Sequence, residues 1–183
     1  ALMREILRSE TYQRSSAVLP HNKQDDRFYS RFYPRRLMAE VLLDAISQVS
    51  EVPTEFAKIE HKGADIRTTK EYPLGTRATE LYDSAVLSSF LSKFGRNSRD
   101  IVCECERTNK PNLVQVLHIA NGSTINEKLK SSKSCVQIAI SKPATLNEAI
   151  IREAFLKTVA REPTEHESTE LLNIIEQAGE DDR

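Results

Sequence analysis

Two stretches in the first half of the chain carry apolar residues at helical spacing. Over 35–49 the apolar positions recur every third or fourth residue, and they follow Pro34, a residue that suits the first turn of a helix. Over 84–94 a second stripe lies between Asp83, a plausible N-cap, and Gly95, a plausible stop. The pattern therefore predicts one amphipathic helix over 35–49 and another over 84–94.

The stretch between these helices, 51–82, keeps neither helical nor strand spacing. Pro53, Gly63, Pro73 and Gly75 interrupt it. We expect an ordered loop that holds a short pair of strands, and long structured loops are often functional.

In the second half, Pro111 precedes a helical pattern in which Leu113, Val114, Leu117 and Ala120 share one side. The pair Asn121-Gly122 offers a left-handed residue that would end this helix. A short helix over 125–129 is expected next.

Two capping boxes mark the starts of the last two predicted helices. In Thr145-x-x-Glu148 and Thr164-x-x-Glu167 the hydroxyl and the carboxylate can each accept a hydrogen bond from a backbone N–H at the helix start. Because the link over 161–163 is short, the two helices should form an antiparallel hairpin over 145–179.

These elements predict an all-α fold. We expect a single irregular domain over 1–183, with about six helices, the long loop 51–82 and the hairpin 145–179. Residues 1–7 resemble the middle of an amphipathic helix without an N-cap, so we expect the chain to be the C-terminal part of a larger protein.

The charge balance narrows the classes of partner. The chain has 26 Lys and Arg against 27 Asp and Glu, which gives a formal net charge of -1. Such a chain has no long-range field that would draw it to a polyanion. No apolar run is long enough for a membrane span or a secretory signal, so neither is expected within these residues.

The three cysteines suggest one candidate metal site. Cys103 and Cys105, with Cys135 or His118, could supply soft ligands for zinc. However, structural zinc sites separate paired cysteines by two to four residues, and no second ligand pair is present. The alternative is that the cysteines are small buried hydrophobic residues, and we expect no metal or other cofactor.

The stretch 27–36, RFYSRFYPRR, alternates basic and aromatic residues as single-strand nucleic-acid binders do. The balanced overall charge and the absence of a nucleic-acid-binding motif favour a structural interpretation. In that interpretation the aromatic rings pack under the helix 35–49, and the arginines pair with Asp25, Asp26, Glu40 or Asp44. No nucleic-acid partner is therefore expected.

Glu40 and Asp44 lie four residues apart, on one face of the first predicted helix. Paired carboxylates can carry out general acid and base catalysis, as in glycoside hydrolysis. The alternative is an ion-pair network with Arg35, Arg36 or Arg77. Motifs for a serine nucleophile, a zinc protease or a phosphate-binding glycine loop are absent.

Several segments together resemble one family. They are RFYPRRL at 31–37 with Glu40 and Asp44, PLGTRA at 73–78, FGR at 94–96, CECER at 103–107, QVLHIANG at 115–122 and REPT at 161–164. In order and spacing they resemble the C-terminal domain of unknown function, family 1553, of planctomycete-type multidomain cytochrome proteins. The resemblance begins near Thr11 and departs at 58–70, which looks like an insertion.

The resemblance implies a setting and no activity. Full-length members look like secreted or periplasmic proteins, often with an N-terminal c-type haem domain. This chain has no C-x-x-C-H sequence, so we expect no covalently attached haem in it.

Two hypotheses about function follow. In the first, the chain is an uncharacterised structural or interaction domain of a larger extracytoplasmic protein, and its partners are other domains of the same polypeptide. In the second, it is an enzyme domain that acts on surface polysaccharide. Its site would then gather five charged residues around the loop: Glu40, Asp44, Arg77, Glu104 and Arg107.

Overall fold

The computed structural model describes residues 2–61, 63–97, 112–141 and 147–178. They are predominantly helical, which confirms the predicted fold class. The chain divides into two compact units, Ala1–Leu37 and Met38–Arg183, and each is described by itself. The expectation of a single domain over 1–183 stays a prediction.

The first unit holds one short helix followed by a series of turns. Helix α1 (Leu2–Arg8) lies where the sequence predicts helical residues over 1–7. The hydroxyl of Ser9 donates to the carbonyl of Ile6 in the last turn of this helix. Further along, the side-chain oxygen of the buried Asn22 accepts from the Leu19 amide at 2.7 Å. Side chains that bond backbone therefore hold much of this unit together.

The second unit begins with α2 (Ala39–Ser50), which starts later than the predicted position 35. Met38 has extended backbone angles and acts as the N-cap, and Leu37 before it is 55% exposed. The helix begins where Ala39 can be buried, so burial and not Pro34 sets its start. It ends at Glu51, which adopts a left-handed conformation with φ 61°.

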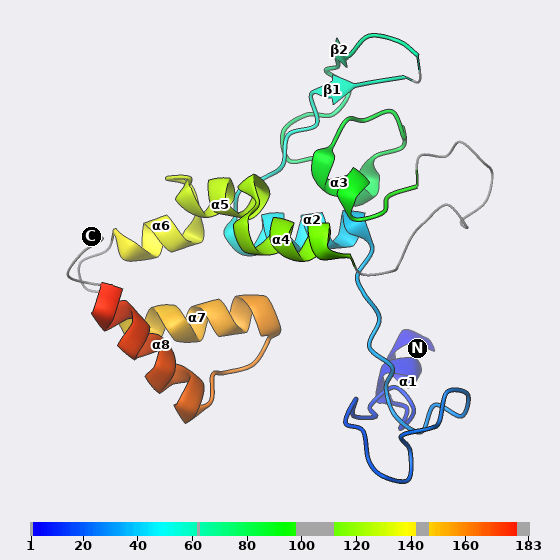
Figure 1. The fold of residues 1–183 in the computed structure, drawn as a ribbon, viewed down its shortest axis with the longest axis vertical. Helices are drawn as coiled ribbons and strands as arrows, with labels where there is room; N and C mark the ends of the chain where they lie inside the picture. Colours follow the sequence, from blue (N-terminus) through cyan, green and yellow to red (C-terminus); the bar gives the residue numbers. More distant parts are fainter. Residues whose placement is uncertain (1, 62, 98–111, 142–146, 179–183) are drawn as a thin grey trace. The chain divides into compact units, whose positions relative to one another are not determined.

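The predicted loop contains the expected pair of strands, β1 (Lys58–Ile59) and β2 (Arg67–Thr68), which are antiparallel with Lys58 opposite Thr68 (Figure 1). A 3₁₀ turn, η1 (Ala78–Glu80), follows. The strand pair occupies the segment that looked like an insertion.

The prediction of a helix over 84–94 is wrong for its first half. Val86 forms a bridge with Ile59, and the amide of Leu87 donates to the carbonyl of Lys58 at 2.8 Å. Because these backbone groups bond to β1, the helix begins only at α3 (Ser89–Lys93), where Ser88 accepts from the amide of Leu91. Gly95, with φ 83°, ends it as predicted.

The hydrophobic core of the second unit lies among α2, η1, α3 and the intervening loop. Leu43 and Leu91 are its largest fully buried apolar side chains, each 1% exposed. The remaining buried members are Ala39, Phe56, Tyr72, Ala78, Leu81, Val86, Phe90 and Phe94. The loop therefore contributes to the core, which explains why it is ordered without regular structure.

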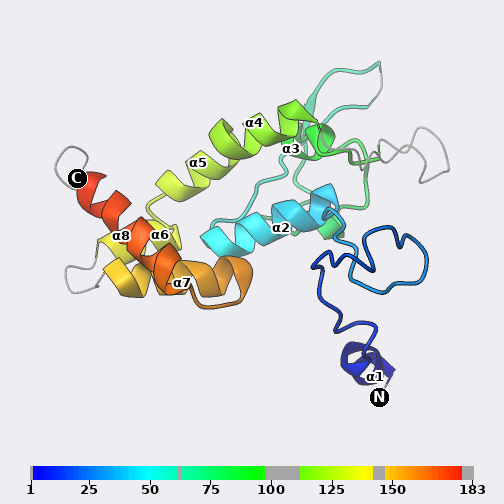
Figure 2. The same ribbon diagram turned by 60° about the horizontal axis from the view of Figure 1, so that its bottom comes forward.

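Three short helices follow: α4 (Leu113–Asn121), α5 (Ser123–Lys130) and α6 (Cys135–Ile140). Figure 2 shows α4 running into α5 with only a short break. The residue at that break, Gly122, has φ −71°, so the predicted left-handed stop is wrong. Helix α6 was not predicted, although Ser134 caps it by accepting from the amide of Gln137.

The predicted C-terminal hairpin is present as α7 (Asn147–Val159) and α8 (Glu165–Ala178), which lie side by side in Figures 1 and 2. The capping box at Thr164 is confirmed: its amide donates to Glu167 Oε2 at 2.8 Å, and the Glu167 amide donates to its hydroxyl. The other predicted box begins at Thr145, which lies outside the described residues.

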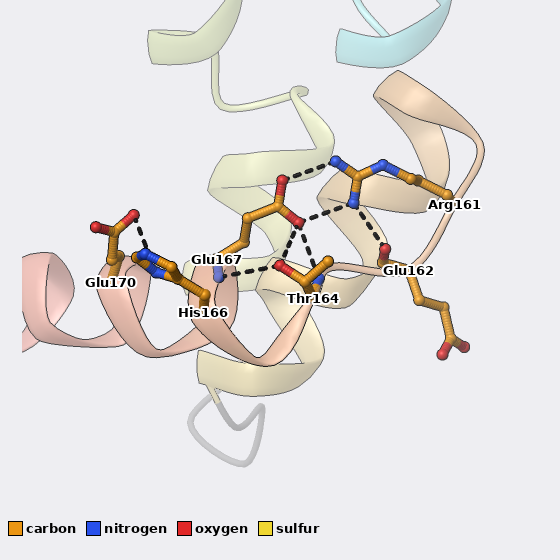
Figure 3. Close-up of polar contacts among 6 residues, drawn as sticks. All are labelled: Arg161, Glu162, Thr164, His166, Glu167 and Glu170. Atoms are coloured by element: carbon orange, nitrogen blue, oxygen red, sulfur yellow. Dashed lines mark hydrogen bonds and ion pairs between the residues drawn. The ribbon is translucent and has the colours of Figure 1, made fainter. Parts of the chain in front are cut away.

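A bidentate ion pair stabilises the start of α8. Figure 3 shows the Arg161 guanidinium against the carboxylate of Glu167, with nitrogen–oxygen distances of 2.7 and 2.8 Å. Arg161 also donates to the carbonyl of Glu162 at 3.0 Å. The bonds from Arg161 and from the amide of Thr164 to the Glu167 carboxylate lower the pKa of Glu167 to about 2.

The C-terminal end of α2 is a junction for the later helices. Lys128 of α5 donates to the carbonyl of Val52 at 2.6 Å, and Cys135 of α6 donates to that of Val49 at 3.1 Å. Lys157 of α7 pairs with Glu51 at 2.7 Å. Carbonyls in the last turn of a helix lack helical partners, and the thiol of Cys135 supplies one for Val49. Lys128 binds the chain just after the helix.

Candidate functional site

The predicted charged cluster begins with Asp44, whose carboxylate caps η1 from across the fold. Oδ1 accepts from the amide of Ala78 at 2.6 Å, and Oδ2 accepts from the amide and the hydroxyl of Thr79 at 3.1 and 2.8 Å. Amides at the start of a helical turn have no partner within the turn, so Asp44 serves as its cap.

Glu40, one turn earlier on the same face of α2, faces a different partner. Its carboxylate lies 3.7 Å from Nε of Arg96, and the two side chains are only 12% and 9% exposed. Arg96 also donates to the carbonyl of Asp83 at 2.9 Å. This nearly buried pair joins the N-terminal turn of α2 to the segment that follows α3.

Arg77 does not join these carboxylates. Its Nε lies 3.2 Å from Glu80 within η1, and its side chain is 67% exposed. The other two predicted members, Glu104 and Arg107, lie outside the described residues.

Among the described residues, Asp44, Glu40 and Arg77 therefore bond to different partners: the start of η1, a guanidinium and a neighbouring carboxylate. A general acid or base must reach the proton that it transfers. The oxygens of Asp44 are occupied by three donors, and the carboxylate of Glu40 lies against a guanidinium in a nearly buried site. What the arrangement does chemically is hold α2, η1 and the segment after α3 in register.

A second group of candidates lies on α4, where the buried residues are polar. Gln115 is 3% exposed and donates from its side chain to the carbonyl of Lys93 at 2.9 Å, at the end of α3. The ring of His118, 9% exposed, lies 5.7 and 6.0 Å from the ring centres of Phe90 and Phe94. These two residues, three apart, attach α4 to α3.

The surroundings of His118 favour its neutral form. Nε2 lies 3.0 Å from the hydroxyl of Thr124. Burial, together with the positive charge of Lys93, lowers the pKa of His118 below its ordinary value. The ring is thus a packed, uncharged residue at neutral pH.

The close approach of backbone at Gly122 explains why this position is a glycine. A Cβ here would lie 2.1 Å from the carbonyl oxygen of His118 and 2.8 Å from its Nδ1. The amide of Gly122 donates to that same carbonyl at 2.9 Å. Steric crowding, and not a positive φ, is the reason for the glycine.

Comparison with known protein families gives one match. Residues 1–175 match the family described as PSD1, protein of unknown function (DUF1553). The chain belongs to this family. No curated protein and no solved structure matches it.

Membership in the DUF1553 family confirms the resemblance seen in the sequence. In this member the motif QVLHIANG supplies the contact between α3 and α4 through Gln115 and His118, and Gly122 lies against the backbone of His118. The motif REPT supplies the link of the hairpin and its ion pair, through Arg161 and Thr164. Both motifs thus have structural roles.

The two candidate zinc ligands that the structure describes, Cys135 and His118, lie on different helices. Cys135 donates its thiol to a backbone carbonyl at the end of α2, whereas His118 packs on α3. Cys103 and Cys105 lie outside the described residues. Within the described ranges, no three His, Cys, Asp or Glu side chains gather in an arrangement that could hold a metal ion.

Two of these contacts, those of Arg96 and Lys128, could not be predicted from the sequence. The pairing of Arg96 with Glu40 has no local signal, because the two residues lie far apart in the sequence. Lys128, 7% exposed, had no distinguishing signal either; burial lowers its pKa. Among the described helices, none has the length and the hydropathy that a membrane span requires.

Proposed function

We propose that the chain is a structural and docking domain of a larger extracytoplasmic protein, and that α4 presents the surface on which another domain of the same polypeptide lies. One observation carries this proposal: α4 buries its polar residues and exposes its apolar ones. The extracytoplasmic setting is supported only by the family resemblance.

The exposed apolar residues of α4 are Leu113 (71%), Val116 (58%), Val114 (54%), Leu117 (52%) and Ile119 (48%). The buried positions of α4 are occupied by Gln115 and His118. A helix in a folded domain ordinarily turns its apolar stripe toward the core. Clustered exposed apolar side chains mark surfaces that another protein surface covers.

The charged residues of the same unit support a non-catalytic role. Asp44 and Glu40 join segments of the fold, and Arg77 is paired with Glu80. A polysaccharide-cleaving site built on Glu40 and Asp44 would require these carboxylates to exchange their present partners for substrate.

Substitutions on α4 test the proposal. Leu117→Glu places a charge on the apolar face and should weaken binding of this chain to the separately produced remainder of its polypeptide by at least about tenfold, since burying an unpaired charge is costly. Ile174→Glu is the matched control, because Ile174 is 59% exposed on α8. It should leave the affinity unchanged.

Isothermal titration calorimetry gives the affinities, and far-UV circular dichroism verifies that both variants are folded. Equal effects of the two substitutions, or no binding by the parent chain, would reject the docking surface on α4. Sedimentation that shows a dimer broken only by Leu117→Glu would assign the face to a second copy instead, and would also reject the proposal.

A further inference from the structure

The first unit contains a cavity of about 310 Å³ lined by residues of the basic and aromatic stretch. Its walls are formed by Thr11, Tyr29, Arg31, Phe32, Tyr33 and Arg35. The volume lies at the lower end of the range for ligand pockets, which is enough for one ring-sized group. The lining residues comprise three aromatic residues, two arginines and one threonine.

Arg31 is one of the two cationic residues that line this pocket. Its Nε is buried and has no hydrogen-bond partner, and its guanidinium carbon lies 4.7 Å from the centre of the Tyr33 ring. A buried donor without an acceptor is costly. Stacking on Tyr33 fixes the plane of the guanidinium.

Arg31 and Arg35 bring two positively charged side chains to the pocket. Neither Arg31 nor Arg35 forms an ion pair with a carboxylate in the described part of the chain. Asp26 lies 3.7 Å from Arg27, which does not line the pocket. A ligand that brings its own anion would therefore find two cations.

Asp25, an acidic residue of the same unit, bonds backbone amides with its carboxylate. Its carboxylate accepts from the amides of Arg27 and Phe28 at 3.0 and 2.8 Å through Oδ1, and from that of Ser30 at 2.9 Å through Oδ2. A side-chain hydrogen bond from Ser30, together with these backbone bonds, holds the pKa of Asp25 far below its usual range.

The same bonds hold Tyr29 in place on the pocket wall. Its φ is 52°, a left-handed conformation that is rare for a bulky residue. The Asp25 carboxylate bonds amides on both sides of it, at Phe28 and Ser30, and Arg14 donates to its carbonyl. Such strain persists only where the surroundings enforce it, and it is frequent at ligand sites.

We propose that this pocket binds an acidic sugar residue, whose carboxylate or sulfate accepts hydrogen bonds from Arg31 and Arg35 while the sugar ring packs on the aromatic walls. A guanidinium matches the geometry of both oxyanions with paired N–H donors. The C–H groups on one face of a pyranose ring pack well on an aromatic ring. The inference is independent of the docking role of α4.

The charge and size of the pocket favour a saccharide over a nucleic acid. A nucleic-acid strand needs a succession of cations along its phosphates, as well as aromatic platforms for successive bases. Here the chain has a net charge of -1, and the two cations serve a single ring-sized pocket.

Calorimetric titration of the full 183-residue chain tests the proposal with four probes of matched length. They are an oligogalacturonate, a sulfated galactan oligosaccharide, a neutral galacto-oligosaccharide and a single-stranded oligodeoxynucleotide. One or both acidic saccharides should bind, more weakly as salt rises, and the neutral one should not. The first two probes distinguish the carboxylate from the sulfate.

Arg31→Gln should lower the affinity for the acidic saccharide by about tenfold or more, because it removes a charged donor. Arg31→Lys keeps the charge but loses Nε and should bind weakly too. Arg35→Gln, at an exposed position, serves as a second test if Arg31 variants fold poorly. Arg27→Gln is the matched control, since Arg27 is 83% exposed and outside the pocket.

The proposal is overturned if no saccharide binds, if the neutral saccharide binds as well as the acidic ones, or if the oligodeoxynucleotide binds in preference to them. It is also overturned if Arg31→Gln and Arg35→Gln, both verified as folded, bind the acidic saccharide as the Arg27→Gln control does.

Discussion

Replacing Asp44 with asparagine tests whether this carboxylate is a structural cap. The native side chain accepts three hydrogen bonds, one from Ala78 and two from Thr79. Asparagine keeps one oxygen acceptor without its charge and turns an NH₂ group toward the remaining donors.

The cost follows from those bonds. A hydrogen bond to a charged group contributes about 1.5–3 kcal/mol and a neutral one about 0.5–1.5 kcal/mol. The bond from Ala78, if the asparagine oxygen keeps it, therefore loses about 1 kcal/mol. The two bonds from Thr79 lose their acceptor at a cost of about 1–2 kcal/mol together, because Thr79 is exposed and water replaces most of each bond. We expect a loss of about 2–3 kcal/mol in the free energy of unfolding.

The assay is thermal unfolding followed by far-UV circular dichroism. In a chain of this size each kcal/mol shifts the midpoint by about 2–4 °C, so Asp44→Asn should lower it by roughly 5–10 °C. Asp65→Asn, at an exposed position without a bond to another described residue, should leave it nearly unchanged. An Asp44→Asn midpoint equal to that of this control would refute the capping role.

Three further substitutions follow from the same geometry. Glu40→Gln leaves Arg96 nearly buried without its carboxylate and should cost roughly 3 kcal/mol, as urea unfolding would show; a change below about 0.5 kcal/mol would mean that the pair is dispensable. Gly122→Ala forces a Cβ onto the backbone of His118 and should cost about 1–3 kcal/mol or more, whereas an unchanged urea midpoint would contradict the crowding. Glu167 has a folded pKa of about 2 against an ordinary 4.5, so its stabilisation is complete above pH 4.5 and disappears as the pH falls toward 2. An acid titration of Glu167→Gln should lack that loss, and an acid transition identical to that of the parent would disprove the assignment.

The parts of the fold that were predictable are those that local chemistry decides. The capping box from Thr164 to Glu167 spans three residues, and Gly95 ends α3 through its own backbone. Both are readable without knowing what lies elsewhere in the chain. The same holds for the shared face of Glu40 and Asp44, four residues apart on α2.

The parts that failed depend on partners distant in the sequence. The segment before Ser89 pairs with β1 because Val86 meets Ile59, which no local pattern indicates. Asp44 bonds residues 34 and 35 positions away.

The side of α4 that contacts α3 could not be predicted from the sequence either. Its stripe of apolar residues predicted a helix correctly, yet the side that contacts α3 is the one with Gln115 and His118. Apolar periodicity identifies an amphipathic helix without stating whether core or partner covers the stripe.

The docking role of α4 is tested most directly by hydroxyl-radical footprinting of Leu113 and Leu117, in this chain alone and in the longer polypeptide. Both side chains are more than half exposed in the chain described here, at 71% and 52%. We predict strong labelling in the isolated chain and severalfold weaker labelling in the longer polypeptide, with Ile174 on α8 labelled equally in both. Equal labelling of Leu113 and Leu117 in the two samples would contradict the proposal.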